Sequence, residues 1–294
     1  MPLIIRSFIN LVLIKYIVSE IEGDFDIVWS FDPYRLQNLR IFKSEKTIYH
    51  PVDIHESNRE VDITNAADYI FCPSLAISKR IKCVSNKKYI IPHGLSKYFI
   101  LKDVNTHRFQ HSHTRVGFVG NLNYKYLDHH VLKIIIRENP EIEFILIGPL
   151  KTKLYSSLFT NNKIFSIIKS YSNVKYFGEI DSEGLPKIYE SLDAFLLCYK
   201  GDVFKNHMAN PHKILEFLSS GKVVISHYID TYKNHRDIVE MANKNNDLPH
   251  LFKNIIYNLV HYNRSDLVER RIEYAKMNSY TKHLLTIEKI LYGP

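Results

Sequence analysis

The sequence predicts an α/β protein whose strands form parallel, doubly wound sheets in two domains. Short apolar runs rich in Val, Ile, Phe and Tyr alternate with helical segments along most of the chain. Strands that alternate with helices pair in parallel, because each helix returns the chain to the same edge of the sheet. Residues 100–114 lose the apolar periodicity, which indicates a linker. The hydrophobic content of 45% and the charged content of 24% are those of a folded, soluble protein.

Residues 1–21 are predicted to form an amphipathic helix that packs on a sheet. The segment is apolar, but Arg6, Lys15 and Glu20 interrupt it. The uninterrupted apolar run is too short to span a bilayer, and no small-residue cleavage site follows it. A helix that lies on a membrane surface is the alternative interpretation.

The first domain is predicted to span residues 1–108 and the second residues 109–294. In the first domain, helices are expected from Pro33 and over residues 74–83, and strands at residues 26–30, 46–50, 68–72 and 88–91. The second domain is Rossmann-like. It begins with a strand at residues 116–120 and a helix from about Asp128, and it ends with helices near residues 246–262 and 266–291.

Residues 210–226 are the most informative stretch of the chain. Asn210 suits the N-cap of a helix, and Pro211 suits its first position because the missing N–H is not needed there. Gly221 falls where this helix ends, since glycine takes the left-handed conformation without strain. Residues 223–225 then read as a short buried strand, so the stretch predicts helix, glycine and parallel strand in that order.

Lys213 and Glu216 lie three residues apart on the polar side of this helix. A surface salt bridge is the plainest interpretation of such a pair. The position near the helix start favours another interpretation, because the N–H groups there attract anions. In that arrangement the helix start and Lys213 bind a nucleoside diphosphate, and Glu216 accepts hydrogen bonds from both ribose hydroxyls.

The stretch resembles the donor-site signature of GT-B glycosyltransferases of the retaining group 1 type, roughly P-x-K-x-x-E-[FY]-L-A-x-G-K-P-V-[VI]. Ser219, Ser220 and Val223 depart mildly from it, and Met208 stands where the family's first glutamate would be. The resemblance covers roughly residues 23–291 and is strongest over residues 115–226. It implies two Rossmann-like domains, sugar transfer without a metal, and a last helix, about 266–291, that crosses back to the N-terminal domain.

The resemblance also implies which residues bind the nucleotide sugar. In the loop after residues 116–120 the family often has an arginine where Asn121 stands, which leaves Lys125 as the cationic contact. Residues 143–149 match the family's "f.liGp" motif, and residues 173–178 match a motif that flanks the nucleobase. The expected donor-binding residues are Gly120, Asn121, Lys125, Phe177, Gly178, Asn210, Pro211, Lys213 and Glu216.

The expected catalytic residues are His50, Asp53 and Lys213. The resemblance places His50 near a histidine that lies by the sugar in this family, with Asp53 beside it. The alternative is that His50 only ends its strand before Pro51. Retaining transfer needs stabilisation of the leaving group more than a strong base, and positive charge supplies it without a metal. No cofactor is expected, because the nucleotide sugar is a substrate.

Metal and nucleic-acid partners are not expected. The D-x-D pair of Asp24 and Asp26 precedes a strand instead of following one, and no cysteine or carboxylate completes a set around the histidines at 111, 113, 129 and 130. The net charge of +8 is scattered and no nucleic-acid motif accompanies it, so anionic lipid or a phosphorylated glycolipid accounts for it better. Three cysteines without pairing parity fit a reducing cytoplasm.

The sequence therefore predicts a glycosyltransferase that moves a sugar from a UDP- or GDP-sugar to a saccharide or lipid-linked acceptor with retention. Surface polysaccharide biosynthesis in the cytoplasm, or at the inner face of the membrane, is the expected setting. The family's opening strand–helix pairs are not seen before residue 26, so the N-terminal domain is expected to be shortened. The alternatives are a non-catalytic nucleotide-sugar-binding or scaffold protein with an incomplete N-terminal domain and, more distantly, an epimerase of the same fold.

Overall fold

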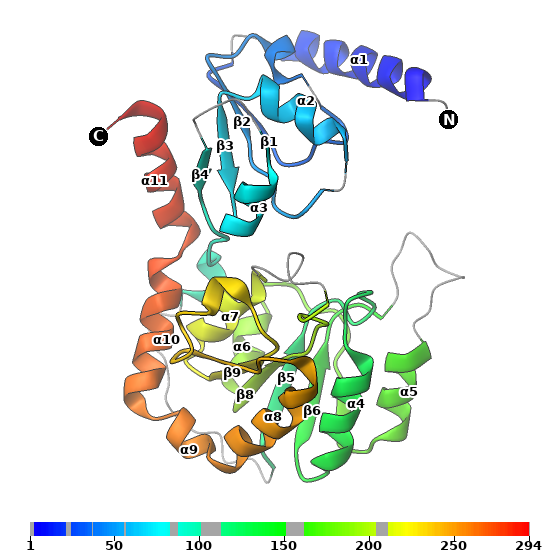
Figure 1. Ribbon diagram of the computed structural model, residues 1–294, viewed down its shortest axis with the longest axis vertical. Helices are drawn as coiled ribbons and strands as arrows, with labels where there is room; N and C mark the ends of the chain where they lie inside the picture. Colours follow the sequence, from blue (N-terminus) through cyan, green and yellow to red (C-terminus); the bar gives the residue numbers. More distant parts are fainter. Residues whose placement is uncertain are drawn as a thin grey trace. The chain divides into compact units, whose positions relative to one another are not determined.

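A computed structural model divides the chain into two compact units, residues 1–93 (unit 1) and 94–294 (unit 2), each with its own parallel sheet (Figure 1). The predicted domain boundary at 108/109 lies within residues 101–112, outside the described part of the chain. The predicted return of the last helix to the N-terminal domain stays a prediction. The structure describes residues 3–21, 25–36, 38–55, 57–82, 88–100, 113–150, 162–203 and 211–293.

Unit 1 is a four-stranded parallel sheet with the order β1-β2-β3-β4. All four strands lie where the sequence predicts them, to within one or two residues at each end. The core combines side chains of the strands with those of the helices that connect them, among them Tyr49, Ile63 and Ile70, which are fully buried. The elements are β1 (Ile27–Ser30), η1 (Leu39–Phe42), β2 (Lys46–Tyr49), α2 (Arg59–Ala66), β3 (Tyr69–Cys72), α3 (Leu75–Arg80) and β4 (Lys88–Ile90).

Where the sequence predicts a helix from Pro33, the described residues form a turn and the short 3-10 helix η1. Asp32 Oδ1 accepts the backbone N–H of Tyr34 at 2.8 Å, and this local bond favours a turn over a helix. Lys43 then takes the left-handed conformation, with φ 52°, and ends η1 before β2. Capture of backbone groups by a side chain therefore outweighs the helical spacing of the apolar residues here.

Helix α1 (Leu3–Glu20) confirms the predicted first helix, but the prediction that it packs on a sheet is wrong. Its described side chains are mostly exposed, including Phe8 at 67%, Leu13 at 51% and Tyr16 at 61%. Successive residues of a helix point about 100° apart, so an apolar run at consecutive positions cannot be buried on one face. None of the helices within the described residues is both long and apolar enough to cross a membrane.

Unit 2 is a six-stranded parallel sheet with the order β10-β9-β8-β5-β6-β7. The chain moves outward from β5 to β7 and then returns to place β8 beside β5. Because the order reverses there, right-handed connections put α4 and α5 on one face and α6 and α7 on the other. Helix α8 packs with α4, and α10 packs with α7 (Figure 1). The carboxyl ends of β5 and β8 thus flank the topological switch point, where open α/β sheets bind ligands.

The predicted strands at residues 116–120 and 223–225 and the predicted helix from about Asp128 all correspond to elements of unit 2. The apolar side chains of unit 2 form one continuous core on both faces of the sheet. The elements are η2 (Lys97–Phe99), β5 (Arg115–Val119), α4 (His129–Glu138), β6 (Glu143–Ile147), α5 (Asn162–Ser170), β7 (Val174–Tyr176), α6 (Leu185–Glu190), β8 (Ala194–Leu197), α7 (Lys213–Ser219), β9 (Val223–Ser226), η3 (Asp230–Tyr232), β10 (Val239–Met241), η4 (Asn245–Asp247), α8 (Leu248–Tyr257), α9 (Leu259–Tyr262), α10 (Ser265–Met277) and α11 (Tyr280–Tyr292).

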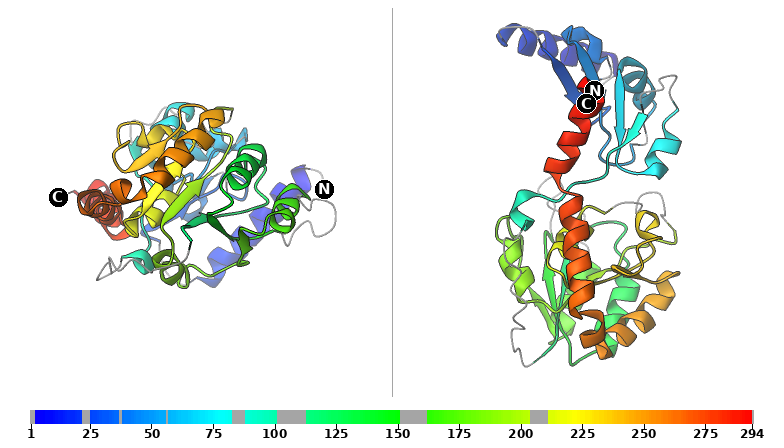
Figure 2. Two further views of the ribbon diagram at one scale, coloured as in Figure 1. Left: turned by 90° about the horizontal axis from the view of Figure 1, so that it is seen from below. Right: turned by 90° about the vertical axis from the view of Figure 1, so that its left-hand side faces the viewer.

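The helix predicted over residues 266–291 is two helices, α10 and α11, and Figure 2 shows the break between them. The Leu95 N–H donates to the Asn278 carbonyl at 2.8 Å, and the Leu95 carbonyl accepts the Tyr280 N–H at 3.1 Å. Gly94 permits this approach, since a Cβ there would lie 2.5 Å from Tyr280 Cδ1. The break therefore coincides with backbone pairing to a segment far away in the sequence.

Candidate functional site at the carboxyl edge of unit 2

Three glycines end three neighbouring strands of unit 2, with Gly120 after β5, Gly148 after β6 and Gly178 after β7. The Gly120 N–H donates to the Ile147 carbonyl at 3.0 Å, and the Gly148 N–H donates to the Gly178 carbonyl at 2.8 Å. A Cβ on Gly148, where φ is 134°, would overlap the Gly120 carbonyl oxygen. At these three glycines the strand ends therefore offer backbone groups, and no side chains, at this edge of the sheet. Gly120 and Gly178 are predicted site residues, and Gly148 is an addition to them.

The loop after β5 lies beside the segment that follows β8, next to the switch point. The Asn121 side chain is exposed and its Oδ1 accepts the Asn123 N–H at 2.9 Å, which shapes the turn. The Lys125 side chain is exposed as well, with Nζ 4.6 Å from the centre of the Tyr126 ring. The Tyr126 carbonyl accepts the Lys200 N–H at 2.9 Å, which joins this loop to the segment after β8. Lys125 thus places a cation at the edge where ligands of such sheets bind.

Lys213 and Glu216 form the predicted pair in the first turn of α7. Lys213 Nζ lies 3.1 Å from Glu216 Oε1 and 2.9 Å from Oε2. The side chains are only 20% and 12% exposed, so this is not the ordinary surface salt bridge. Tyr189 of α6 is a third member, because its hydroxyl donates to Glu216 Oε2 at 3.2 Å. Burial raises the pKa of Glu216, while Lys213 and Tyr189 act in the opposite direction.

The start of α7 differs from the prediction. The helix begins at Lys213, so Pro211 precedes it instead of being its first residue. The Pro211 carbonyl accepts the Ile214 N–H at 3.2 Å, which makes a separate turn and occupies one of the N–H groups expected to bind an anion. Asn210 lies outside the described residues. The predicted glycine end is confirmed, with Gly221 at φ 75°. The donor-binding role of Asn210 and Pro211 stays a prediction.

Phe177 follows β7 directly and lies beside Gly178. Its N–H is held by the Leu146 carbonyl at 3.0 Å, while its ring is 44% exposed. The Tyr176 hydroxyl donates to the Gly148 carbonyl at 3.0 Å and braces the same strand ends. Because the Phe177 ring is exposed and lies next to the Gly178 backbone, it is suited to stacking on a planar group such as a nucleobase.

The two predicted catalytic residues of unit 1 lie in different surroundings. His50 directly follows β2 and is half-buried among aromatic rings, with its ring centroid 5.8 Å from that of Trp29, 5.6 Å from Phe31 and 5.9 Å from Phe71. Asp53 is exposed, and its Oδ1 accepts the Ile54 N–H at 2.8 Å. His50 lies at the carboxyl edge of its sheet, as both hypotheses for it require, and the catalytic role of either residue stays a prediction.

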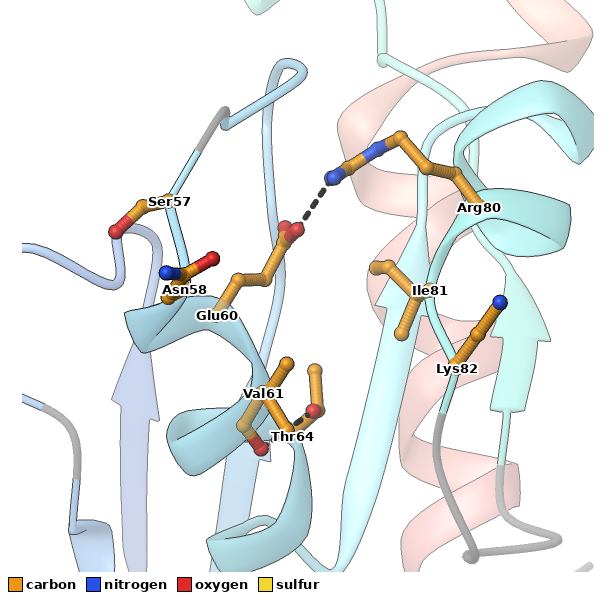
Figure 3. Close-up of a pocket in the computed structure, with 8 residues that line it drawn as sticks. All are labelled: Ser57, Asn58, Glu60, Val61, Thr64, Arg80, Ile81 and Lys82. Atoms are coloured by element: carbon orange, nitrogen blue, oxygen red, sulfur yellow. Dashed lines mark hydrogen bonds and ion pairs between the residues drawn. The ribbon is translucent and has the colours of Figure 1, made fainter.

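A cavity of about 160 Å³ lies between α2 and α3 in unit 1. Figure 3 shows Glu60 of α2 and Arg80 of α3 pointing toward one another, and the two form an ion pair. Glu60 Oε1 also accepts the Tyr49 hydroxyl at 2.9 Å, so both oxygens of this buried carboxylate have partners. No residue predicted for the site lines this cavity. It is lined by Ser57, Asn58, Glu60, Val61, Thr64, Arg80, Ile81 and Lys82.

His227 is a buried polar residue that the sequence did not single out. It follows β9 at the carboxyl edge and is fully buried, and the Tyr199 N–H lies 3.4 Å from its Nδ1. Its Nε2 has no hydrogen-bond partner within the described part of the chain. Burial lowers the pKa of His227 to about 4, so the ring is neutral at pH 7. Within the same described residues, no three His, Cys, Asp or Glu side chains gather as a metal site.

No protein-family model matches the sequence, and no curated protein matches it. Solved structures match the fold. Sucrose-phosphate synthase from Thermosynechococcus elongatus superposes with a TM-score of 0.70 and 14% identity, covering 95% of this chain and 75% of that one. Anabaena Alr3699/HepE, solved in complex with UDP-glucose, gives a TM-score of 0.72 and 14% identity, covering 96% of this chain and 82% of that one.

A glycosyltransferase from Rickettsia africae gives a TM-score of 0.67 and 16% identity, covering 98% of this chain and 82% of that one. Identities at this level establish a common fold and nothing finer. The two parallel-sheet units of this chain therefore have the GT-B fold, which confirms the predicted fold class.

Proposed function

We propose that this chain is a glycosyltransferase that moves a sugar from a UDP- or GDP-sugar to a saccharide or lipid-linked acceptor, with retention of configuration. The observation that carries the proposal is the Lys213–Glu216 pair, in which a carboxylate only 12% exposed lies 2.9 Å from a lysine. A nucleoside diphosphate offers complementary groups, namely phosphate oxygens for the lysine and ribose hydroxyls for the carboxylate. The GT-B fold supports the proposal, since the fold neighbour HepE was solved with UDP-glucose.

The residues around the pair have separate roles in this proposal. Lys213 and Lys125 neutralise the diphosphate and stabilise the charge that develops when the sugar leaves it. Gly120, Gly148 and the Gly178 turn let the nucleotide approach the backbone, and the exposed Phe177 ring lies against the base. His50 and Asp53 act on the side of the sugar and the acceptor. No step in this scheme requires a metal or a cofactor.

The cellular setting is also part of the proposal. Three cysteines without pairing parity favour the cytoplasm, and the exposed apolar side chains of α1 favour contact with the inner face of a membrane. Lipid-linked acceptors and surface polysaccharides are assembled in such a setting, which is why we propose that pathway for the chain. Nucleic acid has no role in it.

Calorimetric titration of the full chain with UDP and GDP tests the nucleotide site. A hydrogen bond to a charged group contributes about 1.5–3 kcal/mol, so Glu216→Ala should weaken binding about tenfold or more. Glu143→Ala is the matched control, because Glu143 forms a similar partly buried ion pair with Arg115 at 2.8 Å, at the opposite, amino-terminal edge of the sheet. Equal affinity of wild type and a folded Glu216→Ala variant would remove the basis of the proposal.

Turnover separates the enzyme from a non-catalytic binding protein. Release of UDP from a UDP-sugar, with water or a simple saccharide as acceptor, is expected of a transferase. A chain that binds UDP through Glu216 but releases none from any UDP-sugar would support the binding-protein alternative instead.

A further inference from the structure

Glu216 has more donors around it than a bound nucleotide would allow. A carboxylate offers roughly four acceptor positions. Lys213 already contacts both oxygens, and Tyr189 occupies a further position on Oε2. Two ribose hydroxyls require two positions, so at least one of the present contacts must be released when a nucleotide binds.

The two protein donors differ in how easily they leave. Lys213 is 20% exposed and is carried on a long flexible side chain, so it can turn toward a phosphate. Tyr189 is 1% exposed. Its ring is wedged between Phe195 at 4.8 Å and Phe217 at 5.7 Å, centre to centre. Lys213 is therefore the exchangeable partner of Glu216, and Tyr189 is the permanent one.

We infer that Tyr189 is a positioning residue, whose hydroxyl keeps the Glu216 carboxylate oriented and charged toward the ribose after Lys213 has moved to the diphosphate. This inference rests on the proposed function of the same site. A buried carboxylate that loses its lysine becomes easier to protonate, and a protonated Glu216 accepts fewer hydrogen bonds. Within the described part of the chain, the groups that face Glu216 are Lys213 from α7, Tyr189 from α6 and Tyr280 from α11. Of these, Tyr189 is the hydroxyl that donates to it.

The test is Tyr189→Phe, which removes the hydroxyl and keeps the ring. We expect UDP affinity at pH 7 to fall about tenfold, as for loss of one hydrogen bond to a charged group. The pH at which affinity is lost on acidification should rise, because the pKa of Glu216 rises without its donor. Adding Tyr189→Phe to Glu216→Ala should cause no further loss. Tyr49→Phe is the matched control, since it removes the equivalent tyrosine-to-glutamate bond, Tyr49 to Glu60, in unit 1.

A second measurement separates failure of this inference from failure of the proposed function. The pKa of Glu216 is measured by ¹³C NMR in the nucleotide-free chain, and it should be higher in Tyr189→Phe than in wild type. Wild-type affinity and an unchanged Glu216 pKa in Tyr189→Phe would overturn the inference while UDP binding stood. An additional loss of affinity on the Glu216→Ala background would also overturn it, since Tyr189 would then act independently of Glu216. Absence of both UDP and GDP binding by wild type would overturn the proposed function itself.

Discussion

Three buried ionisable side chains in unit 2 respond to burial in different ways. Glu216 forms an ion pair with Lys213 and accepts a hydrogen bond from the Tyr189 hydroxyl. Arg271 is fully buried, donates to the Gly221 carbonyl at 3.1 Å, and has its pKa lowered to about 10, so it stays charged at pH 7. His227, with a pKa of about 4, is neutral at pH 7. The first of these arrangements suits ligand binding, and the other two serve the folded state.

Unit 2 should lose stability when His227 is forced to accept a proton. The unfolded histidine binds its proton at about pH 6.5, whereas the folded one does so only near pH 4. The stability that the neutral ring contributes is therefore complete above pH 6.5 and falls as the pH drops toward 4, by about 3 kcal/mol in all. Aspartates 128 and 202 face the ring and moderate the effect. Guanidinium denaturation at pH 7 and pH 5, followed by circular dichroism, measures it.

His227→Asn is the control for this prediction, because its amide oxygen can accept the bond that Nδ1 accepts and it does not titrate. Trp29 is the single tryptophan and lies in unit 1, so its fluorescence follows unit 1 separately. An acid sensitivity of unit 2 that persists unchanged in His227→Asn would assign the effect to other groups.

At the scale of elements, the joined ends of β5, β6 and β7 set the shape of the candidate site. Gly148 and Gly178 both have positive φ, yet only one of them is sterically closed. A Cβ on Gly148 overlaps the Gly120 carbonyl, whereas a Cβ on Gly178 meets no atom within 4 Å. Alanine at Gly178 therefore tests the strain of a positive φ alone, whereas alanine at Gly148 tests that strain together with a steric clash.

Gly148→Ala should destabilise unit 2 by about 3 kcal/mol or more, because the clash involves rigid backbone. Gly178→Ala should cost about 1–2 kcal/mol, the strain of a left-handed residue alone. Hydrogen exchange of peptides from β5 and β6 measures the difference. Equal effects of the two substitutions would show that the strand ends can separate without penalty.

Among the described residues, helix α1 exposes more large apolar side chains than any other helix. We expect the full chain to float with vesicles of anionic lipid in a density gradient, and Leu13→Lys with Tyr16→Lys to reduce the bound fraction several-fold. Tyr257→Lys with Val260→Lys is the matched control, since Tyr257 on α8 is 70% exposed and Val260 on α9 is 66% exposed. Equal flotation of the α1 variant and the control would contradict membrane contact through α1.

At the scale of the whole molecule, charge for the diphosphate is provided by lysines in the proposed scheme. UDP affinity should therefore stay within about twofold in excess EDTA, since no ion contributes to ΔG of binding. Titration with and without chelator measures it. A large loss of affinity that Mn²⁺ or Mg²⁺ restores would show that a metal holds the phosphates.

Local patterns made the strand–helix order and much of the site predictable. The helix before Gly221, the buried strand after it and the Lys213–Glu216 pair all depend on neighbouring residues, and the structure has each of them. Tyr189 was not predictable as a partner of Glu216, because a hydrogen bond between residues of two different helices depends on the fold. The break between α10 and α11 was not predictable for the same reason. The exposure of α1 was not predictable from its apolar composition, because apolar residues at consecutive positions do not form a single helical face.

The pairing of Leu95 with Asn278 and Tyr280 also bears on how the protein is made. A nascent chain emerges from the ribosome from its amino end, and domains form as their contacts become available. Leu95 is 1% exposed, yet its hydrogen-bond partners are synthesised only after nearly all of unit 2. Until then both of its backbone groups must be hydrated or unpaired, which disfavours the native position. Unit 2 should consequently be among the last parts of the molecule to reach its native form during translation, however early its sheet begins to assemble.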